Sequence, residues 1–462
     1  IVSGATVIFD GTGNYSQDNA ATVYGRGDAT LWWDSTGFYS PNGSFTSTGF
    51  RDVFWNSEAR INQDAVFRGS NLIVGGGFSA QNRAIGTSGS PPKIVIANGG
   101  TISSSTNVFH ASSFSNRGGL FVSSSALGLT GAEEATGTDN LDEIATTDKF
   151  TIEAWFKAST DDNYRTIFSR GTSWETGNID VYMDAAGNVK GSTYDLASTL
   201  TSTTAGLADS KWHHVAYTYD TSTTYIKLYI DGKLEAEFAG SHPTLSTQTN
   251  GFKIGDRDGD NWVGDIGRVS VWKSALSETL IRKMMFMDWT TMAADSDFTD
   301  GDAIGWWQFD EGTGTDVGDS SSQSNDATLN LAAWAGAGTF TYGTSTVDMT
   351  DSSAINLVAG LSQFYNLNVA ASGKTTTLSP LGANDIRFHG TLTHGGGTAS
   401  SINNPAWTMK GTSNISANSS WNGWYLCYWE SSSSPPASTF RYWLPTVAVS
   451  LAGNMTCVDE TD

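Results

Sequence analysis

Cysteine is nearly absent from this chain of 462 residues, which contains only Cys427 and Cys457. Neither lies in a CxxC or Cys/His spacing that would indicate a zinc site. The two thiols can form one disulfide, which would close a loop of about 30 residues, or they can remain buried free thiols. The sequence leaves both states of the pair open.

Basic residues are also scarce, since 25 Lys and Arg stand against 47 Asp and Glu, for a formal net charge of −22. Such a surface repels nucleic-acid phosphate and anionic membranes. No apolar run approaches the roughly 20 residues that a membrane span needs. We therefore expect neither a nucleic-acid partner nor a membrane span. The first four residues lack the charged start of a signal peptide, so the chain is expected to be an internal or processed piece.

Recognisable catalytic motifs are missing as well. No glycine-rich phosphate loop follows a strand and opens a helix, and no Ser/His/Asp set has a known local signature. We predict that the protein is not an enzyme.

Glycine, serine, threonine and aromatic residues are abundant, with 51 Gly, 17 Trp and an aromatic share of 12%. This mixture suits many short strands joined by turns, and so many aromatic residues argue against a disordered chain. We predict an all-β protein in three segments: a β-rich attachment segment at 1–117, an antiparallel sandwich at 118–342, and a β-rich segment with a Trp-rich end at 343–462. In the first segment, residues 92–102 are typical of one rung of a β-solenoid, a strand followed by a glycine corner.

The middle segment has the most regular patterns. Residues 150–156 alternate, which places Phe150 and Ile152 on one face of a strand and Glu153 on the other. The Asp-Gly pair at 231–232 predicts a tight hairpin. Ser277 is expected to cap a short helix over residues 278–286 that closes one end of the sandwich.

Five ordered segments of this region resemble the laminin-G-like, concanavalin A-like jelly rolls: residues 150–157, 166–170, 212–216, 228–232 and 263–277. Residues 305–315 and 319–327 are similar to the closing strand of that family and its Asp/Asn-rich turn. The resemblance implies a two-sheet antiparallel sandwich with a glycan- or protein-binding surface, commonly assisted by calcium, in a secreted or virion protein. Relatives that hydrolyse β-glucans carry a Glu-x-Asp-x-x-Glu strand. Here the places two and four residues after Glu153 hold Trp155 and Lys157.

Two acidic turns are candidate Ca²⁺ sites, because calcium takes six to eight oxygen ligands that a flexible turn can supply. The alternative for both is a solvated turn. The residues in question are Asp256, Asp258, Asp260 and Asn261 in the first turn, and Asp319, Asn325 and Asp326 in the second.

Three aromatic residues in or near expected loops are candidate ligand-binding residues: Trp174, Tyr194 and Trp262. An exposed ring can stack on the apolar face of a sugar while neighbouring Asp or Asn side chains accept its hydroxyl protons. Core packing is the alternative for each.

These observations favour a non-catalytic structural and binding protein of a virion or cell surface, with a phage decoration or tail-fibre protein as the preferred hypothesis. The flanks would attach or self-associate while the jelly roll binds a glycan or protein. A secreted bacterial adhesin or carbohydrate-binding protein is the alternative. A glycoside hydrolase is the third, and it requires acids from separate strands to converge.

Overall fold

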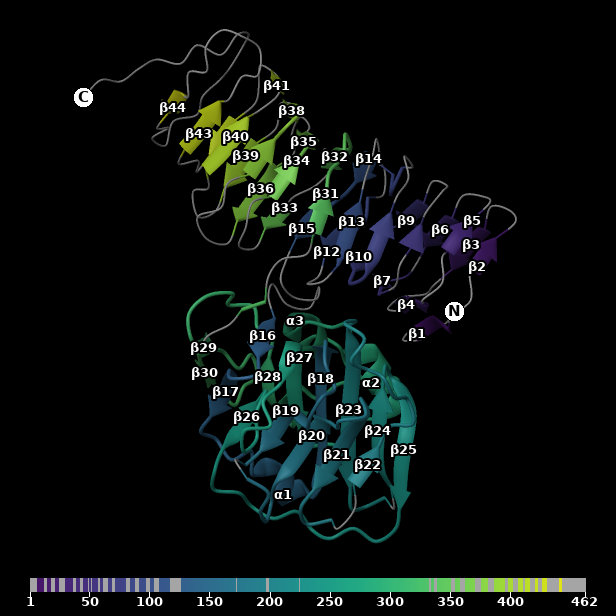
Figure 1. The fold of residues 1–462 in the computed structure, drawn as a ribbon, viewed down its shortest axis with the longest axis vertical. Helices are drawn as coiled ribbons and strands as arrows, with labels where there is room; N and C mark the ends of the chain where they lie inside the picture. The colour runs from purple at the N-terminus through teal and green to yellow at the C-terminus, as the bar shows by residue number, and fades with distance from the viewer. Residues whose placement is uncertain are drawn as a thin grey trace, which may run out of the picture. The chain divides into compact units, whose positions relative to one another are not determined.

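The computed structural model describes residues 126–331, apart from 172, 197, 198 and 224, and residues 334–335 and 339–349. Outside this range it describes the strands given below, residue 50, and short connections between residues 52 and 116 and between 362 and 394. The chain forms two units, residues 1–117 together with 337–462, and residues 118–336 (Figure 1). We call them the solenoid unit and the sandwich unit.

The solenoid unit is built from short strands, nearly all of which pair in parallel with a strand of the next rung. Residues 1–117 and 337–462 together form this one unit. Its longest sheet contains, in spatial order, β1 (Thr6–Gly11), β4 (Thr30–Ser35), β7 (Asp52–Trp55), β10 (Asn71–Val74), β12 (Lys93–Ile96), β15 (Ser113–Asn116), β33 (Ala354–Leu357), β36 (Thr375–Pro380), β39 (Thr398–Ser401) and β42 (Ser420–Asn422).

Shorter sheets form the other sides of the rungs. One side contains β3 (Ala21–Tyr24), β6 (Phe45–Thr48) and β9 (Ala65–Arg68), then β14 (Val108–His110), β32 (Thr346–Met349), β35 (Asn366–Val369), β38 (Thr391–His394) and β41 (Thr412–Ile415). The remaining strands are β2 (Tyr15–Gln17), β5 (Tyr39–Pro41), β8 (Ala59–Arg60), β11 (Gly77–Ser79), β13 (Thr101–Ser103), β31 (Thr339–Thr341), β34 (Ser362–Phe364), β37 (Ile386–Phe388), β40 (Ala406–Met409), β43 (Leu426–Trp429) and β44 (Phe440–Tyr442). Cys427 lies in β43, where its side chain is not described, and Cys457 lies outside the described residues, so their disulfide stays a prediction.

The sandwich unit is an insertion between two neighbouring rungs of the solenoid. Strand β15, which ends before the insertion, pairs in parallel with β33, which follows it, and β14 pairs with β32 in the same way. Rung length varies, because the residues in register are Thr6, Thr30, Asp52 and Asn71, which are 24, 22 and 19 positions apart. A solenoid with such unequal rungs leaves no strict period in the sequence.

The sandwich unit consists of two antiparallel sheets. The first contains β16 (Leu127–Thr130), β27 (Val263–Trp272), β18 (Lys149–Ala158), β23 (His213–Asp220), β24 (Tyr225–Ile230) and β25 (Lys233–Ala239), with β28 (Ala303–Trp307) also paired to β27. The second contains β22 (Thr199–Thr201), β21 (Val189–Thr193), β20 (Ile179–Met183), β19 (Arg165–Arg170), β26 (Phe252–Ile254), β17 (Glu134–Gly137), β30 (Ala327–Asn330) and β29 (Asp316–Val317). The all-β class and the jelly-roll sandwich predicted from the sequence are confirmed.

The core between the sheets comes from alternate residues of each strand, as the pattern predicts. Phe150 and Ile152 of β18 are fully buried against residues of the facing sheet, among them Ile179 and Val181 of β20. The hairpin between β24 and β25 turns at Asp231 and Gly232, with φ of 53° and 71°. Both angles are positive, as a two-residue turn matching the strand twist requires.

Three helices and one short 3-10 turn complete the unit: α1 (Glu143–Thr147), α2 (Glu278–Met284), α3 (Trp289–Ala293) and η1 (Asp300–Asp302). Ser277 caps α2, because its hydroxyl accepts a hydrogen bond from the Leu280 amide at 3.3 Å. The helix does not close an end of the sandwich. Ile281 and Met284 instead form a second apolar cluster with residues of the first sheet that point away from the main core, such as Ala216. No described helix is long and apolar enough to span a membrane.

A buried ionic network joins this helical layer to the first sheet. Arg268 of β27 donates to both carboxylate oxygens of Glu153, from Nε at 3.0 Å and from Nη2 at 2.7 Å. His214 Nε2 and the Ser270 hydroxyl also bond this carboxylate, each at 2.6 Å. Burial by itself would raise the pKa of Glu153, but the Arg268 charge and the His214 contact hold it at about 2. The carboxylate is therefore ionised and fully engaged.

Replacement of Glu153 tests how much the sandwich depends on this network. Glu153→Gln removes the charge and leaves Arg268 buried without its counter-ion, so we expect a loss of about 3–5 kcal/mol in the free energy of unfolding. Urea denaturation of the whole chain measures this loss. Glu237→Gln, at an exposed position of β25, is the control and should change stability by less than about 0.5 kcal/mol. Equal stability of the two variants would contradict the assignment.

Candidate functional site

An acidic side chain lies at the centre of the outer face of the second sheet. Ile179 and Val181 of β20 point into the core, so Asp180 between them points to the opposite face. Its carboxylate is almost completely buried and is bonded by Arg257. Burial raises the pKa of Asp180 to about 6, although the Arg257 guanidinium opposes the rise.

Arg257 connects this carboxylate to an exposed aromatic ring. Its guanidinium also pairs with Asp260 at 3.2 Å, and it lies 5.6 Å from the ring centroid of Trp174. One cation is therefore shared between two carboxylates and an indole face. The positive charge is compensated within the site, and the arginine acts mainly as a rigid support for Trp174.

Trp174 and Tyr194 form an exposed aromatic pair. Their side chains remain 44% and 41% exposed, and their ring centroids are 5.4 Å apart in an edge-to-face arrangement. Rings of this size are normally covered in a folded protein, so two of them exposed together indicate a binding surface. We call Trp174, Tyr194, Arg257, Asp180 and Asp260 the Trp174 site.

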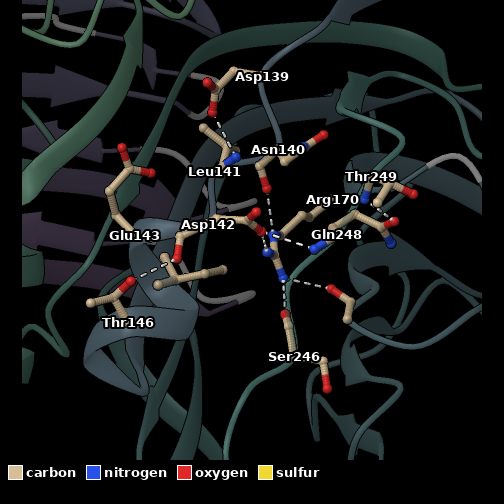
Figure 2. Close-up of polar contacts among 12 residues, drawn as sticks. Asp139, Asn140, Leu141, Asp142, Glu143, Thr146, Arg170, Ser246, Gln248 and Thr249 are labelled. Atoms are coloured by element: carbon tan, nitrogen blue, oxygen red, sulfur yellow. Dashed lines mark hydrogen bonds and ion pairs between the residues drawn. The ribbon is translucent and has the colours of Figure 1, made fainter.

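A buried arginine fixes three loops next to the aromatic pair, and Figure 2 shows its contacts with Asn140, Asp142 and Ser246. Arg170, at the end of β19, donates from Nε to the Asn140 carbonyl at 2.8 Å, and it forms an ion pair with Asp142. Its Nη1 donates to the carbonyls of Gly177 at 2.8 Å and Ser246 at 2.9 Å. Three loops that are distant in sequence are thereby fixed around one side chain, including the loop of residues 171–178 that contains Trp174.

The Tyr194 side of the pair is anchored in a similar way. The Tyr194 amide donates to the Asn178 carbonyl at 2.9 Å, and the neighbouring Asp195 accepts from the Ser246 amide at 2.9 Å. Both aromatic residues therefore stand on the same hydrogen-bonded loop framework. A preorganised pair loses little conformational entropy when it binds a ligand.

Trp262 does not belong to this surface. It is fully buried in the main core, where its ring packs edge-to-face on Phe156 at 5.7 Å. The prediction of an exposed, ligand-binding Trp262 is wrong. The residue immediately precedes β27, and its indole is buried in the core.

The first acidic turn is organised by basic side chains and by the backbone. Asp256 pairs with Lys253 at 2.5 Å, and its other oxygen accepts from the Gly259 amide. Asp260 pairs with Arg257, as described above, while the Asn261 carbonyl accepts from Arg165 at 3.0 Å. Asp258 is exposed, with a positive φ of 54°.

The second acidic turn is closed by its own carboxylates. Asp319 accepts from the amides of Trp306 and Asn325 at 2.7 and 2.8 Å, and Asp326 accepts from the Asp319 amide at 2.8 Å. Asn325 donates to the Ile304 carbonyl at 2.6 Å. Across the part of the chain that the structure describes, no three His, Cys, Asp or Glu side chains group as a metal site requires. Most oxygens of the two turns accept from cations or amides of the chain itself, and Ca²⁺ binding at these turns stays a prediction.

Sequence reasoning identified Trp174 and Tyr194 but missed Asp180 and Arg257, which complete the site. The structure brings the four together from a strand and three loops. Asp180 interrupts an apolar strand, and this was the one signal in the sequence that marked it.

The sandwich unit is similar in sequence to a known superfamily. The sequence model Laminin_G_3, of the concanavalin A-like lectin/glucanases superfamily, matches residues 130–282. No curated protein sequence matches the chain.

Solved structures similar to part of the chain have also been found. They include a protein of Bacteroides ovatus described as carbohydrate binding (19% identity, TM-score 0.36, 46% of this chain and 59% of that one) and the CBM40 module of Ruminococcus gnavus IT-sialidase bound to α2,3-sialyllactose (16%, 0.29, 34% and 94%). Domains LG4-5 of the mouse laminin α1 chain are also similar (14%, 0.26, 34% and 43%). The chain thus spans about three-fifths of the first of these structures. Residues 130–282 thus match the concanavalin A-like lectin/glucanases superfamily in sequence and lie in a two-sheet antiparallel sandwich, as the laminin-G-like resemblance implied.

Proposed function

We propose that the sandwich unit is a non-catalytic glycan-binding module and that its ligand binds at the Trp174 site. The observation that carries the proposal is the exposed pair of Trp174 and Tyr194, held over a fixed polar centre. An aromatic face covers the apolar C–H face of a sugar ring, while Asp260, about a third exposed, accepts hydrogen bonds from its hydroxyls. Glu153, which the network with Arg268 buries completely, is not available to a substrate.

The charges of the site favour a neutral glycan. One guanidinium faces two carboxylates in the Trp174 site, and the whole chain carries a formal net charge of −22. A ligand with carboxylate or sulfate groups would meet a field of its own sign and would find Arg257 already paired. We therefore propose neutral hexose-containing glycans as the ligand class.

We further propose that the protein works outside the cell as a structural component of a virion or cell surface, with a phage decoration or tail-fibre protein as the preferred case and a bacterial adhesin as the alternative. In this proposal the solenoid unit attaches or self-associates, and the inserted sandwich unit presents the glycan site. The support is the topology: parallel strand pairing resumes in register after the insertion, so the sandwich unit is inserted in a repetitive β-solenoid.

Removal of the tryptophan ring tests the site. Trp174→Ala should weaken glycan binding tenfold to hundredfold, because burying one large aromatic face contributes about 1.5–3 kcal/mol. Glycan-array screening of the whole chain, followed by calorimetry on the neutral glycans that bind, measures the change. Tyr225→Ala is the matched control, because Tyr225 is 43% exposed but lies on the other sheet. Unchanged affinity in Trp174→Ala would refute the proposed site.

Acid should weaken the same interaction. Asp180 is ionised above its pKa of about 6 and pairs with Arg257, whereas protonation below that pH releases the arginine that supports Trp174. Affinity is therefore expected to be constant from pH 7 to 8 and to fall as the pH drops through 6. Asp180→Asn, measured by the same calorimetry, should show weak binding with no inflection near pH 6. An inflection that persists in this variant would assign the effect to another group.

The virion assignment has a direct test. If the protein is a virion component, mass spectrometry of purified particles should detect it in a fixed ratio to the major capsid protein. Particles that lack it, together with its recovery from the bacterial cell surface or culture medium, would favour the adhesin instead.

A further inference from the structure

A second aromatic pair, one exposed tyrosine and one half-buried tyrosine, lies on the same face of the second sheet. Tyr164 is 48% exposed, and its ring centroid is 5.9 Å from that of Tyr182. Tyr182 follows Asp180 by two positions in β20, so the two side chains project from the same face of the strand. The pair was not singled out by the sequence, because Tyr164 precedes β19 in an otherwise polar turn.

The two pairs lie at opposite ends of β20. Tyr194 is level with residue 178, whose carbonyl its amide contacts, and Tyr164 immediately precedes Arg165, the partner of Met183. The nearer member of the second pair, Tyr182, is therefore four strand residues from the level of Tyr194, or about 13 Å at 3.3 Å per residue. One sugar ring cannot contact both pairs.

The loop that contains Arg257 and Asp260 links the two ends. The Asp260 carbonyl accepts from the Thr166 amide at 2.9 Å, and Thr166 is the strand partner of Tyr182. The Asp260 carboxylate, at the same time, pairs with Arg257 of the Trp174 site. A polar segment thus lies between two aromatic platforms.

The charges at the tyrosine end are compensated as they are at the tryptophan end. Lys190, opposite Tyr182 in β21, pairs with Asp184 at 3.0 Å, and Arg165 pairs with Asp162 at 2.6 Å. No described basic side chain next to Tyr182 is thereby left to attract an anionic sugar. The whole face has the character of a neutral ligand site.

We propose that Tyr164 and Tyr182 form a second sugar platform, and that the sandwich unit binds a linear neutral oligosaccharide that lies along β20 and contacts both platforms. The inference rests on the proposed function and defines its ligand as a chain of several sugar units. A short oligosaccharide occupies only the Trp174 site. A longer one also contacts the tyrosines. Because it is already bound at the Trp174 site, this second contact forms within the complex at a high effective concentration and raises the overall affinity.

Calorimetry with the whole chain and matched disaccharides and hexasaccharides tests the inference, using β-1,4-linked and α-1,4-linked glucose oligomers as probes. We expect one hexasaccharide to bind at least tenfold more tightly than its disaccharide. Tyr164→Ala should abolish this difference and leave disaccharide binding unchanged, whereas Tyr164→Phe should retain it, because the ring face remains. Tyr225→Ala is again the control.

The outcomes separate the two proposals. Hexasaccharide affinity that is the same in Tyr164→Ala and in the unaltered chain would overturn the second platform and leave the Trp174 site standing. Disaccharide affinity that does not respond to Trp174→Ala would overturn the proposed function itself. Absence of binding to every oligomer in both series would overturn the linear oligosaccharide as ligand, and the proposed function would then be decided by the glycan array alone.

Discussion

The bidentate ion pair between Arg268 and Glu153 is the contact on which the arrangement of the sandwich unit depends. Arg268 also donates to the carbonyls of Met284 and Met287, at 3.1 and 2.5 Å, so a single guanidinium ties the helical segment to the first sheet. Because removing one partner would leave the other charge buried and unpaired, the pair opposes any packing that separates the helical segment from the first sheet. The helical segment thereby packs on the first sheet, and the two aromatic pairs lie on the second.

A second buried arginine holds the loops at the proposed binding surface. Arg170 donates hydrogen bonds to carbonyls of three loops. Arg257 contacts the Trp174 ring and pairs with both Asp180 and Asp260. Both guanidinium charges are paired with carboxylates of the chain, so little positive charge remains to attract a ligand. The same feature that makes the aromatic rings rigid also makes the surface unsuited to anionic ligands, which connects the fold to the ligand class that we propose.

Local patterns allowed much of the sandwich to be predicted. The alternation of residues 150–156, the Asp231-Gly232 turn and the Ser277 cap depend on neighbours in sequence, and all three are observed. Trp262 was misassigned because a loop residue and a core residue look alike when the partner, here Phe156, is far away in the chain. The lysine and arginine that pair with Asp256 and Asp260 are evident only once the turn has closed, so the sequence did not indicate these ion pairs.

The sequence by itself determined the all-β class, the laminin-G-like identity of the middle region and the exposed aromatic candidates Trp174 and Tyr194, because strand alternation, turn residues and composition are local properties. Only the tertiary structure decided that the two flanks form one solenoid unit with the sandwich inserted between its rungs, since unequal rungs of 24, 22 and 19 residues leave no period to detect. Likewise, only packing could place Asp180, Arg257 and the Tyr164–Tyr182 pair on one face. Arg257 and Asp180 are 77 positions apart, and Tyr164 meets Tyr182 only because β19 pairs with β20.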